Sequence, residues 1–275
     1  MKVGIYIYAV AAVAAGIINL VWGDFATDWQ PIQAFGDHVP GREIYAYITA
    51  LWLLAGGAAM LWRRTARGGA VALAVVYAIF GIFWLPRFYY AYYLMAFKLS
   101  IVMGIADGFG QQLVLVAAGI IAYASLATRD SVGTRRMATA ARVAFALSTV
   151  VFGVAHFTSL PTVAALVPAW VYPSGAFWAI VTGIGFVLAG IAILTGFLDV
   201  LGARLLTLML AIFSAVVWIS QLFTFSHDHS AWGGNAYNLA AVGAAWIVGA
   251  WLAETRNHRR KGPSIRRVLE KGAHS

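Results

Sequence analysis

The stretch VGIYIYAVAAVAAGIINLVWG, residues 3–23, decides the fold class of this chain. It carries no charged side chain and, as a helix, is long enough to cross a bilayer, which takes about 20 apolar residues. Seven further apolar stretches follow, at 44–62, 70–86, 108–126, 142–158, 176–196, 201–223 and 237–253. The sequence therefore predicts an all-α polytopic membrane protein with eight transmembrane helices.

A cleaved signal peptide is the alternative interpretation of the first stretch. Lys2 and the alanines before Gly16 resemble the charged end and the cleavage site of a signal. We favour a retained helix, because the apolar run is long for a signal and has a counterpart later in the chain.

The composition supports a bilayer environment. Of the 275 residues, 62% are hydrophobic and 11% charged, and the mean hydropathy is +0.80. Soluble domains are about half apolar and about a quarter charged. Cysteine is absent, which excludes disulfides, thiolate catalysis and Cys-ligated zinc or iron–sulfur clusters. We expect no haem either, since only His156 approaches membrane depth.

The connections between the apolar stretches alternate in charge. One set, with the two termini, carries most of the basic residues: Lys2, Arg63, Arg64, Arg67, Arg129, Arg135, Arg136, Arg142, Arg204 and the basic residues of the tail. The other set carries three, Arg42, Arg87 and Lys98, against the acidic residues Asp24, Asp28, Asp37, Glu43, Asp107 and Asp228. Lys and Arg resist translocation. We therefore expect both termini in the cytoplasm, and a bacterial inner membrane as the location.

The net charge of +9 lies in these connections and in the tail, 255–275, with no compact basic domain to bind nucleic acid. Nucleic acid is therefore not an expected partner. A basic run beside a membrane span is attracted to anionic lipid. Docking of a membrane or cytoplasmic protein partner is the alternative role for the tail.

Landmarks of the first four stretches recur in the same order in the last four. GIIN (16–19) matches GVAH (153–156), LAG (54–56) matches LAG (188–190), and AIF (78–80) matches AIF (211–213). The sequence therefore predicts two four-helix units, 1–128 and 141–254, joined by a cytoplasmic linker, 129–140. An even unit returns the chain to its starting side, so the two repeats are expected to be parallel about an axis along the membrane normal.

Polar side chains gather near the expected outer ends of the helices. They are Asn19, His38, Glu43, Arg87, Asp107, Gln112, His156 and Asn238. Ionisable and amide groups at membrane depth are costly and need a partner. We predict a pocket open to the periplasmic face, with Arg87 and His156 near its floor. The alternative is that these are ordinary loop and helix-end residues in contact with water and headgroups.

Two local patterns add expectations. Pro86 predicts a kink or an end in the third helix, while Asp107 and Gln112 are expected to begin the fourth helix and Asn238 the eighth. His227, Asp228 and His229 place two imidazoles and a carboxylate within three residues. Together with a further ligand such as His38 or His156, they form a candidate metal site.

The second unit resembles the DoxX-like family of small four-helix membrane proteins. The resemblance is carried by FGVAHF (152–157), LVPAW (166–170), Pro173 and LAGI (188–191). It is close over the fifth and sixth helices, looser over the last two, and reaches the first unit only through the repeat. It implies a membrane subunit or helper of a redox system, such as quinone-linked oxidation or enzyme maturation, with a quinone as the implied cofactor. The doubled chain and the lack of cysteine depart from the common form and argue against thiol-redox chemistry.

Three functions remain open on the sequence. The first is a non-catalytic accessory or quinone-linked membrane subunit, which predicts an apolar cleft near His156. The second is a small-molecule or lipid transporter, which predicts a polar cavity that reaches the midplane from both sides. The third is a metal-dependent membrane enzyme at the outer face, which predicts His227, His229 and a third ligand around one point. We lean towards a protein without enzymatic activity.

Overall fold

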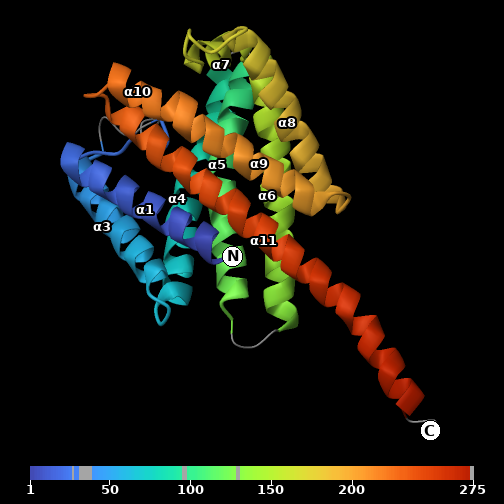
Figure 1. The fold of residues 1–275 in the computed structure, drawn as a ribbon. Helices are drawn as coiled ribbons and strands as arrows, with labels where there is room; N and C mark the ends of the chain where they lie inside the picture. Colours follow the sequence, from blue (N-terminus) through green and yellow to red (C-terminus); the bar gives the residue numbers. More distant parts are fainter. Residues whose placement is uncertain (27, 31–38, 95–97, 128–130, 273–275) are drawn as a thin grey trace.

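The computed structural model describes residues 1–26, 28–30, 39–94, 98–127 and 131–272, with Leu94 and residues 259–272 described as backbone only. Within this part of the chain, eight helical segments are long and apolar enough to cross a membrane (Figure 1). Six of them are single helices: α1 (Lys2–Trp22), α3 (Arg42–Leu61), α4 (Ala66–Leu94), α5 (Leu99–Ser125), α6 (Val132–Thr158) and α8 (Gly175–Thr195). The prediction of an all-helical chain with eight helices long and apolar enough to span a membrane is confirmed for the described residues.

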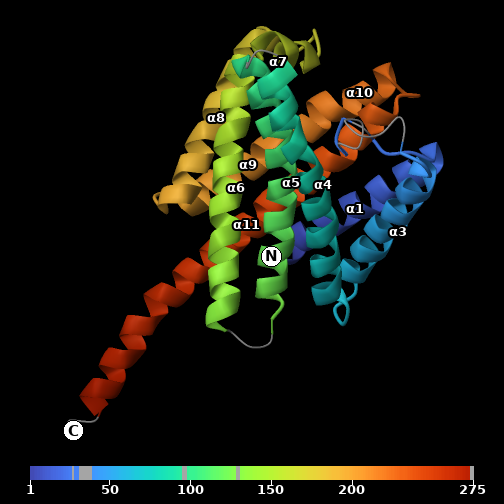
Figure 2. The same cartoon turned by 180° about the vertical axis from the view of Figure 1, so that it is seen from behind.

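The seventh span is a composite of three helical pieces. It runs through α9 (Asp199–Phe213), the π-helical turn η1 (Ser214–Trp218) and α10 (Ile219–Thr224). The eighth span begins the long helix α11 (His229–Gly272), whose C-terminal part projects away from the rest of the molecule (Figures 1 and 2). A short helix, α7 (Leu160–Leu166), lies between α6 and α8.

Helix α4 continues through Pro86 into the aromatic stretch and ends at Leu94. Of the alternatives left open at Pro86, a helix end is therefore wrong. Proline removes one backbone donor, and a helix in a membrane tolerates this where neighbouring groups satisfy the freed carbonyl. The aromatic residues that follow are therefore helical, and Tyr89, Tyr92 and Tyr93 are exposed on the surface of α4.

Three helices begin eight to ten residues earlier than expected. Helix α5 begins at Leu99, α6 at Val132 and α11 at His229. Asp107, Gln112 and Asn238 therefore lie within helices rather than at their starts. A single polar side chain lowers the hydropathy of a window but does not interrupt backbone hydrogen bonding, so the helices extend beyond the apolar runs. For the same reason the stretch expected as a linker, 129–140, is helical from Val132.

The chain runs up and down between two ends of the bundle (Figure 1). We call the end at which α7 and α10 lie the upper end, and the end of the turn between α3 and α4 the lower end. Each helix packs on the next in both halves: α1 on α3, α3 on α4 and α4 on α5, then α6 on α8, α8 on α9 and α9 on α11. The halves meet where α5 packs on α6 and where α11 packs on α1, and α5 also packs on α11.

Glycines set the separation of α6 and α8. A Cβ atom added to Gly153 would lie 2.6 Å from the carbonyl oxygen of Gly183 and 2.5 Å from Cγ2 of Val187. A Cβ atom added to Gly190 would lie 2.8 Å from the carbonyl oxygen of Ala146. Helices in lipid associate through such close approach, because apolar side chains interact with lipid as favourably as they interact with another helix.

Helices α1 and α3 pack in the same way. A Cβ atom added to Gly16 would lie 2.7 Å from the carbonyl oxygen of Ala50, and one added to Gly57 would lie 2.7 Å from that of Ala9. Gly57, rather than its neighbour Gly56, is thus the residue at which α3 touches the backbone of α1.

Replacing Gly153 with alanine tests this packing. The added methyl has no space against the backbone of α8, so we expect Gly153→Ala to lower the free energy of unfolding by about 1–3 kcal/mol. Gly68→Ala in α4 is the matched control, because nothing lies within 4 Å of the added Cβ there. We expect the control to be neutral or to stabilise by up to about 1 kcal/mol through helix propensity. Unfolding in detergent micelles measures both variants, and equal stabilities would contradict the glycine contact.

Candidate functional site

A cavity of about 640 Å³ lies among α5, α6, α7, α8, η1 and α11. Its wall is mostly apolar and aromatic, with Phe152, Phe186, Trp178 and Trp218 among its lining residues. Ligand sites in proteins are typically concave pockets with volumes of about 300–1,000 Å³. They have mostly apolar walls and a few polar groups that fix the orientation of the ligand. The polar side chains of the lining include Asp107, Gln111, His156 and Asn238, together with the hydroxyls of Ser159, Thr162 and Thr182.

His156 projects from the last turn of α6 into this cavity. Its Nδ1 atom lies 2.7 Å from the carbonyl oxygen of Phe152, one turn earlier in the helix. A carbonyl only accepts, so Nδ1 carries the proton and donates it. The ring also packs on Phe186, with ring centroids 5.1 Å apart. In the neutral ring Nε2 is then an acceptor, and no partner of Nε2 is found in the described part of the chain.

Asp107 and Gln111 line the cavity from α5, one helical turn apart. Nε2 of Gln111 donates to Oδ2 of Asp107 at 2.9 Å. Both side chains are partly buried within a membrane-spanning helix. An ionisable group at such a position is a functional candidate, because placing it in a bilayer is costly.

Asn238 of α11 supports the π-helical turn that forms one wall of the cavity. Its Nδ2 atom donates to Oγ of Ser214, the first residue of η1, and to the carbonyl oxygen of Leu210 at 3.2 Å. Asn235 holds the other end of η1, since its Nδ2 donates to the carbonyl oxygen of Trp218 at 2.6 Å. A π turn misaligns backbone groups that an α-helix would pair, and such turns are frequent at functional sites.

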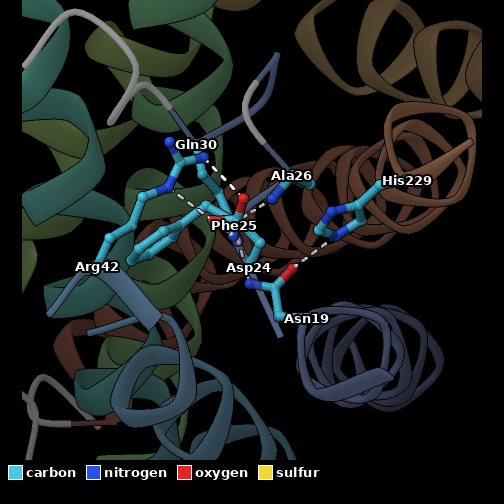
Figure 3. Close-up of polar contacts among 7 residues, drawn as sticks. All are labelled: Asn19, Asp24, Phe25, Ala26, Gln30, Arg42 and His229. Atoms are coloured by element: carbon cyan, nitrogen blue, oxygen red, sulfur yellow. Dashed lines mark hydrogen bonds and ion pairs between the residues drawn. The ribbon is translucent and has the colours of Figure 1, made fainter. Parts of the chain in front are cut away.

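A second polar cluster lies at the end of α1, outside the cavity lining (Figure 3). Nδ2 of Asn19 donates to Oε1 of Gln30 at 2.9 Å, and the backbone N–H of Ala26 donates to the same oxygen at 3.0 Å. Gln30 and Asn19 are buried, and Phe25 beside them is buried too. The segment 23–26 with 28–30 therefore packs into the bundle and satisfies the amide of Asn19.

His229 and an ion pair border this cluster (Figure 3). Nε2 of His229 lies 3.4 Å from Oδ1 of Asn19, and the imidazole stacks on Trp22 with centroids 4.9 Å apart. Arg42 binds the carboxylate of Asp24 through two contacts of 2.8 Å. These interactions tie the start of α3 and the start of α11 to the end of α1.

The remaining predicted pocket residues lie elsewhere. Gln112 is buried, and its Nε2 donates to the carbonyl oxygen of Trp29 at 2.8 Å. The guanidinium of Arg87 lies 4.3 Å from the ring centre of Trp84, and Arg87 is not among the cavity-lining residues.

Glu43 is exposed in the first turn of α3. His38 lies outside the described residues. The cavity thus brings together Asp107, His156 and Asn238 of the predicted set.

The predicted metal ligands adopt separate roles where they are described. Oδ1 of Asp228 accepts the backbone N–H of Ser230 at 3.0 Å, which caps the start of α11. His229 faces Asn19, and His227 is exposed. Within the described residues no group of three His, Asp or Glu side chains is close enough to hold a metal ion. The metal site stays a prediction, since His38 lies outside this part of the chain.

Sequence reasoning did not identify the tryptophans of the cavity wall. Trp29, Trp170, Trp178 and Trp218 come from four different segments of the chain. Nε1 of Trp29 donates to the carbonyl oxygen of Ser230 at 3.1 Å, and Nε1 of Trp178 donates to that of Tyr172 at 2.9 Å. The available signal was the presence of tryptophan in or near the ends of the predicted helices, which an interfacial belt also explains.

Comparison of the chain with protein-family models, with curated proteins and with solved structures finds no match.

The contact between Asn238 and Ser214 allows a double-mutant test. Asn238→Leu removes the donor from Ser214 and from the carbonyl of Leu210, so we expect a loss of about 1–3 kcal/mol in the free energy of unfolding. Ser214→Ala should cost less, and the double variant should cost less than the sum, because the two side chains share one contact. Asn257→Leu, exposed on the same helix, is the control and should change stability by at most about 0.5 kcal/mol. Additive losses would contradict the contact.

Proposed function

We propose that this chain is a membrane protein without enzymatic activity that binds an amphipathic small molecule in the cavity beside His156. The observation that carries the proposal is the cavity itself, an apolar and aromatic space of about 640 Å³ with a few polar side chains. A cavity of this kind costs packing energy, because its lining atoms lack neighbours. It persists where a ligand fills it or where function keeps it open.

A proposed duplication explains why the cavity lies in the second half. Asn19 of α1 and His156 of α6 occupy matching positions in the two repeats. Residues 23–30 follow Asn19, and their described part folds into the bundle, where Gln30 binds the Asn19 amide. After His156 the chain forms α7 instead, and α7 lies across the upper end of the bundle (Figure 1). We propose that the segment after α1 fills the space in the first repeat that corresponds to the cavity, and that this space stays open for a ligand in the second repeat.

Three sets of contacts support the duplication. Gly16 approaches the carbonyl of Ala50 as Gly153 approaches that of Gly183. The other two matches are Gly57 on Ala9 with Gly190 on Ala146, and Gly69 on Gly56 with Gly202 beside Ala189. These contacts pair Gly190 with Gly57, which corrects by one residue the match of LAG (54–56) with LAG (188–190). The packing order of the helices is also the same in both halves, and α5 packs on α6 as α11 packs on α1. Exchange of the two halves preserves this pattern, as expected for a parallel repeat.

We propose that the lower end faces the cytoplasm, together with the N-terminus and the basic tail. Arg63, Arg64 and Arg67 lie at the lower end, where α3 meets α4, and Arg136 lies in the first turns of α6. Acidic residues such as Asp24 and Asp228 lie at the upper end. Positive charge is retained on the cytoplasmic side of membranes, so the cavity would open near the outer leaflet.

Because the chain has no cysteine, labelling of single introduced cysteines can test the proposed membrane orientation and the proposed parallel repeat in one experiment. Single cysteines at Arg64 and Phe197 occupy matching turns of the two repeats, while one at Asp228 lies at the upper end. With an impermeant maleimide on intact bacterial cells, we expect labelling of Asp228→Cys alone. Permeabilised cells should label Arg64→Cys and Phe197→Cys equally. Labelling of the two matching turns from opposite sides would refute the parallel repeat, and labelling of Arg64→Cys in intact cells would refute the orientation.

Filling the cavity tests the binding function. Val163 of α7 lines the cavity, and Val163→Trp is expected to occupy part of its volume. Val181→Trp is the matched control, because Val181 is exposed on α8 and is not a lining residue. After purification in a mild detergent, organic extraction and mass spectrometry should show a bound compound in the wild type and the control. We expect its amount to fall at least several-fold in Val163→Trp.

The same preparation separates the alternatives. Equal recovery of every co-purifying compound from all three proteins would overturn the proposal. A quinone in the extract would support the redox role that the resemblance implies, and a stoichiometric metal would support the metal-dependent alternative. An optical spectrum of the purified protein reads out a bound chromophore directly.

A further inference from the structure

Two polar side chains of the cavity, His156 and Asn238, present acceptor atoms to a ligand. Nδ1–H of His156 is engaged by the carbonyl of Phe152, which leaves Nε2 with a lone pair in the neutral ring. Both N–H groups of the Asn238 amide have partners, the carbonyl of Leu210 and the hydroxyl of Ser214. The Asn238 Oδ1 atom has no partner among the described residues. A ligand that meets these two side chains has to bring hydrogen-bond donors.

The charge of the cavity wall has one sign. Asp107 is the single Asp, Glu, Lys or Arg among the lining residues that the structure describes. Its Oδ2 accepts from Gln111, and no Lys, Arg or His of the described residues pairs with it. An ionised carboxylate in a membrane-spanning helix is costly unless a cation compensates it. A cation in the cavity would remove this cost.

Aromatic rings complete the wall. Trp29 stacks on Tyr237 with centroids 5.7 Å apart and meets Trp218 edge-on at 5.2 Å, and all three line the cavity. Trp170 and Trp178 line it from the side of α7 and α8. The faces of Trp and Tyr attract cations, with a strength that rises when water is excluded.

We infer that the ligand is a lipophilic amine, bound in its protonated form with its ammonium towards Asp107 and His156 and its apolar part along the aromatic wall. This inference rests on the proposed function, because it names the chemical class of the molecule that the cavity takes. The ammonium donates to the Asp107 carboxylate and to Nε2 of His156 or Oδ1 of Asn238, and the charge-assisted bond to Asp107 is the strongest of these.

Three probes of equal chain length separate charge from shape: decylamine, decanol and decyl methyl ether. The measurement is the rise in the thermal unfolding temperature of the full chain in detergent micelles, as a function of probe concentration. Val163→Trp, measured in parallel, removes the contribution of probe dissolved in the micelle. We expect decylamine to bind about tenfold or more tightly than the ether, as a charge-assisted hydrogen bond implies. Asp107→Asn keeps the acceptor for Gln111 and should abolish most of this advantage.

The outcomes are distinct for the two proposals. Equal binding of all three probes, lost in Val163→Trp, would overturn the amine and leave the cavity as a binding site. Decanol equal to decylamine, both tighter than the ether, would overturn the role of charge and indicate a neutral donor. Absence of any effect that Val163→Trp removes would overturn the proposed function together with the inference.

A spectroscopic readout on the wild-type chain avoids dependence on the Asp107 variant. In protein with ¹⁵N-labelled histidine, the Nε2 resonance of His156 is assigned by its loss in His156→Gln. Decylamine should shift this resonance, because Nε2 accepts a hydrogen bond, and decyl methyl ether should leave it unchanged. The same shift with both probes, or a shift with neither, would overturn the contact with His156.

Discussion

The structure depends on the close approach of helix backbones at glycines. In a bilayer, apolar side chains have no preference for one another over lipid, so helices associate where their surfaces fit closely. Gly153 and Gly190 bring α6 and α8 together, and Gly16 and Gly57 do the same for α1 and α3. Beside this contact, Phe152 and His156 of α6 pack on Phe186 of α8. All three side chains line the cavity.

The polar side chains at the ends of α1 and α6 find their hydrogen-bond partners in different ways. The end of α1 presents a buried amide, Asn19, and the chain returns to satisfy it with Gln30. In the proposed repeat, the end of α6 corresponds to the end of α1 and presents His156. One nitrogen of His156 bonds to its own helix backbone, and the ring lines the cavity. A duplicated membrane protein can diverge in this way, with one copy closed for stability and the other open for a ligand. The proposed binding function and the proposed parallel repeat are linked through this comparison.

The wall opposite α6 is held by hydrogen bonds within the membrane. Asn235 and Asn238 of α11 bind the two ends of η1, and the π turn carries Val216, Val217 and Trp218 at the cavity surface. In hydrocarbon an unpaired amide or carbonyl is costly, so these contacts specify one arrangement of the seventh and eighth spans. Aromatic and acceptor groups are thereby kept facing a common space, which is what recognition of a lipophilic cation needs.

The sequence by itself determined that this is a helical membrane protein with eight spans, because hydropathy and length depend on local composition alone. It also pointed to Asp107, His156 and Asn238, because polar residues in apolar stretches are visible without a structure. It misplaced the helix ends near Pro86, Asp107 and Asn238, since backbone hydrogen bonding continues past a single proline or polar side chain. Only the tertiary structure decided which polar residues share a cavity. Arg87 and Asn19 resemble His156 in sequence context, yet packing directs Arg87 onto Trp84 and Asn19 onto Gln30. Both partners are near in the sequence, but which neighbour a side chain contacts depends on how the surrounding segments pack, and the sequence pattern does not show that packing.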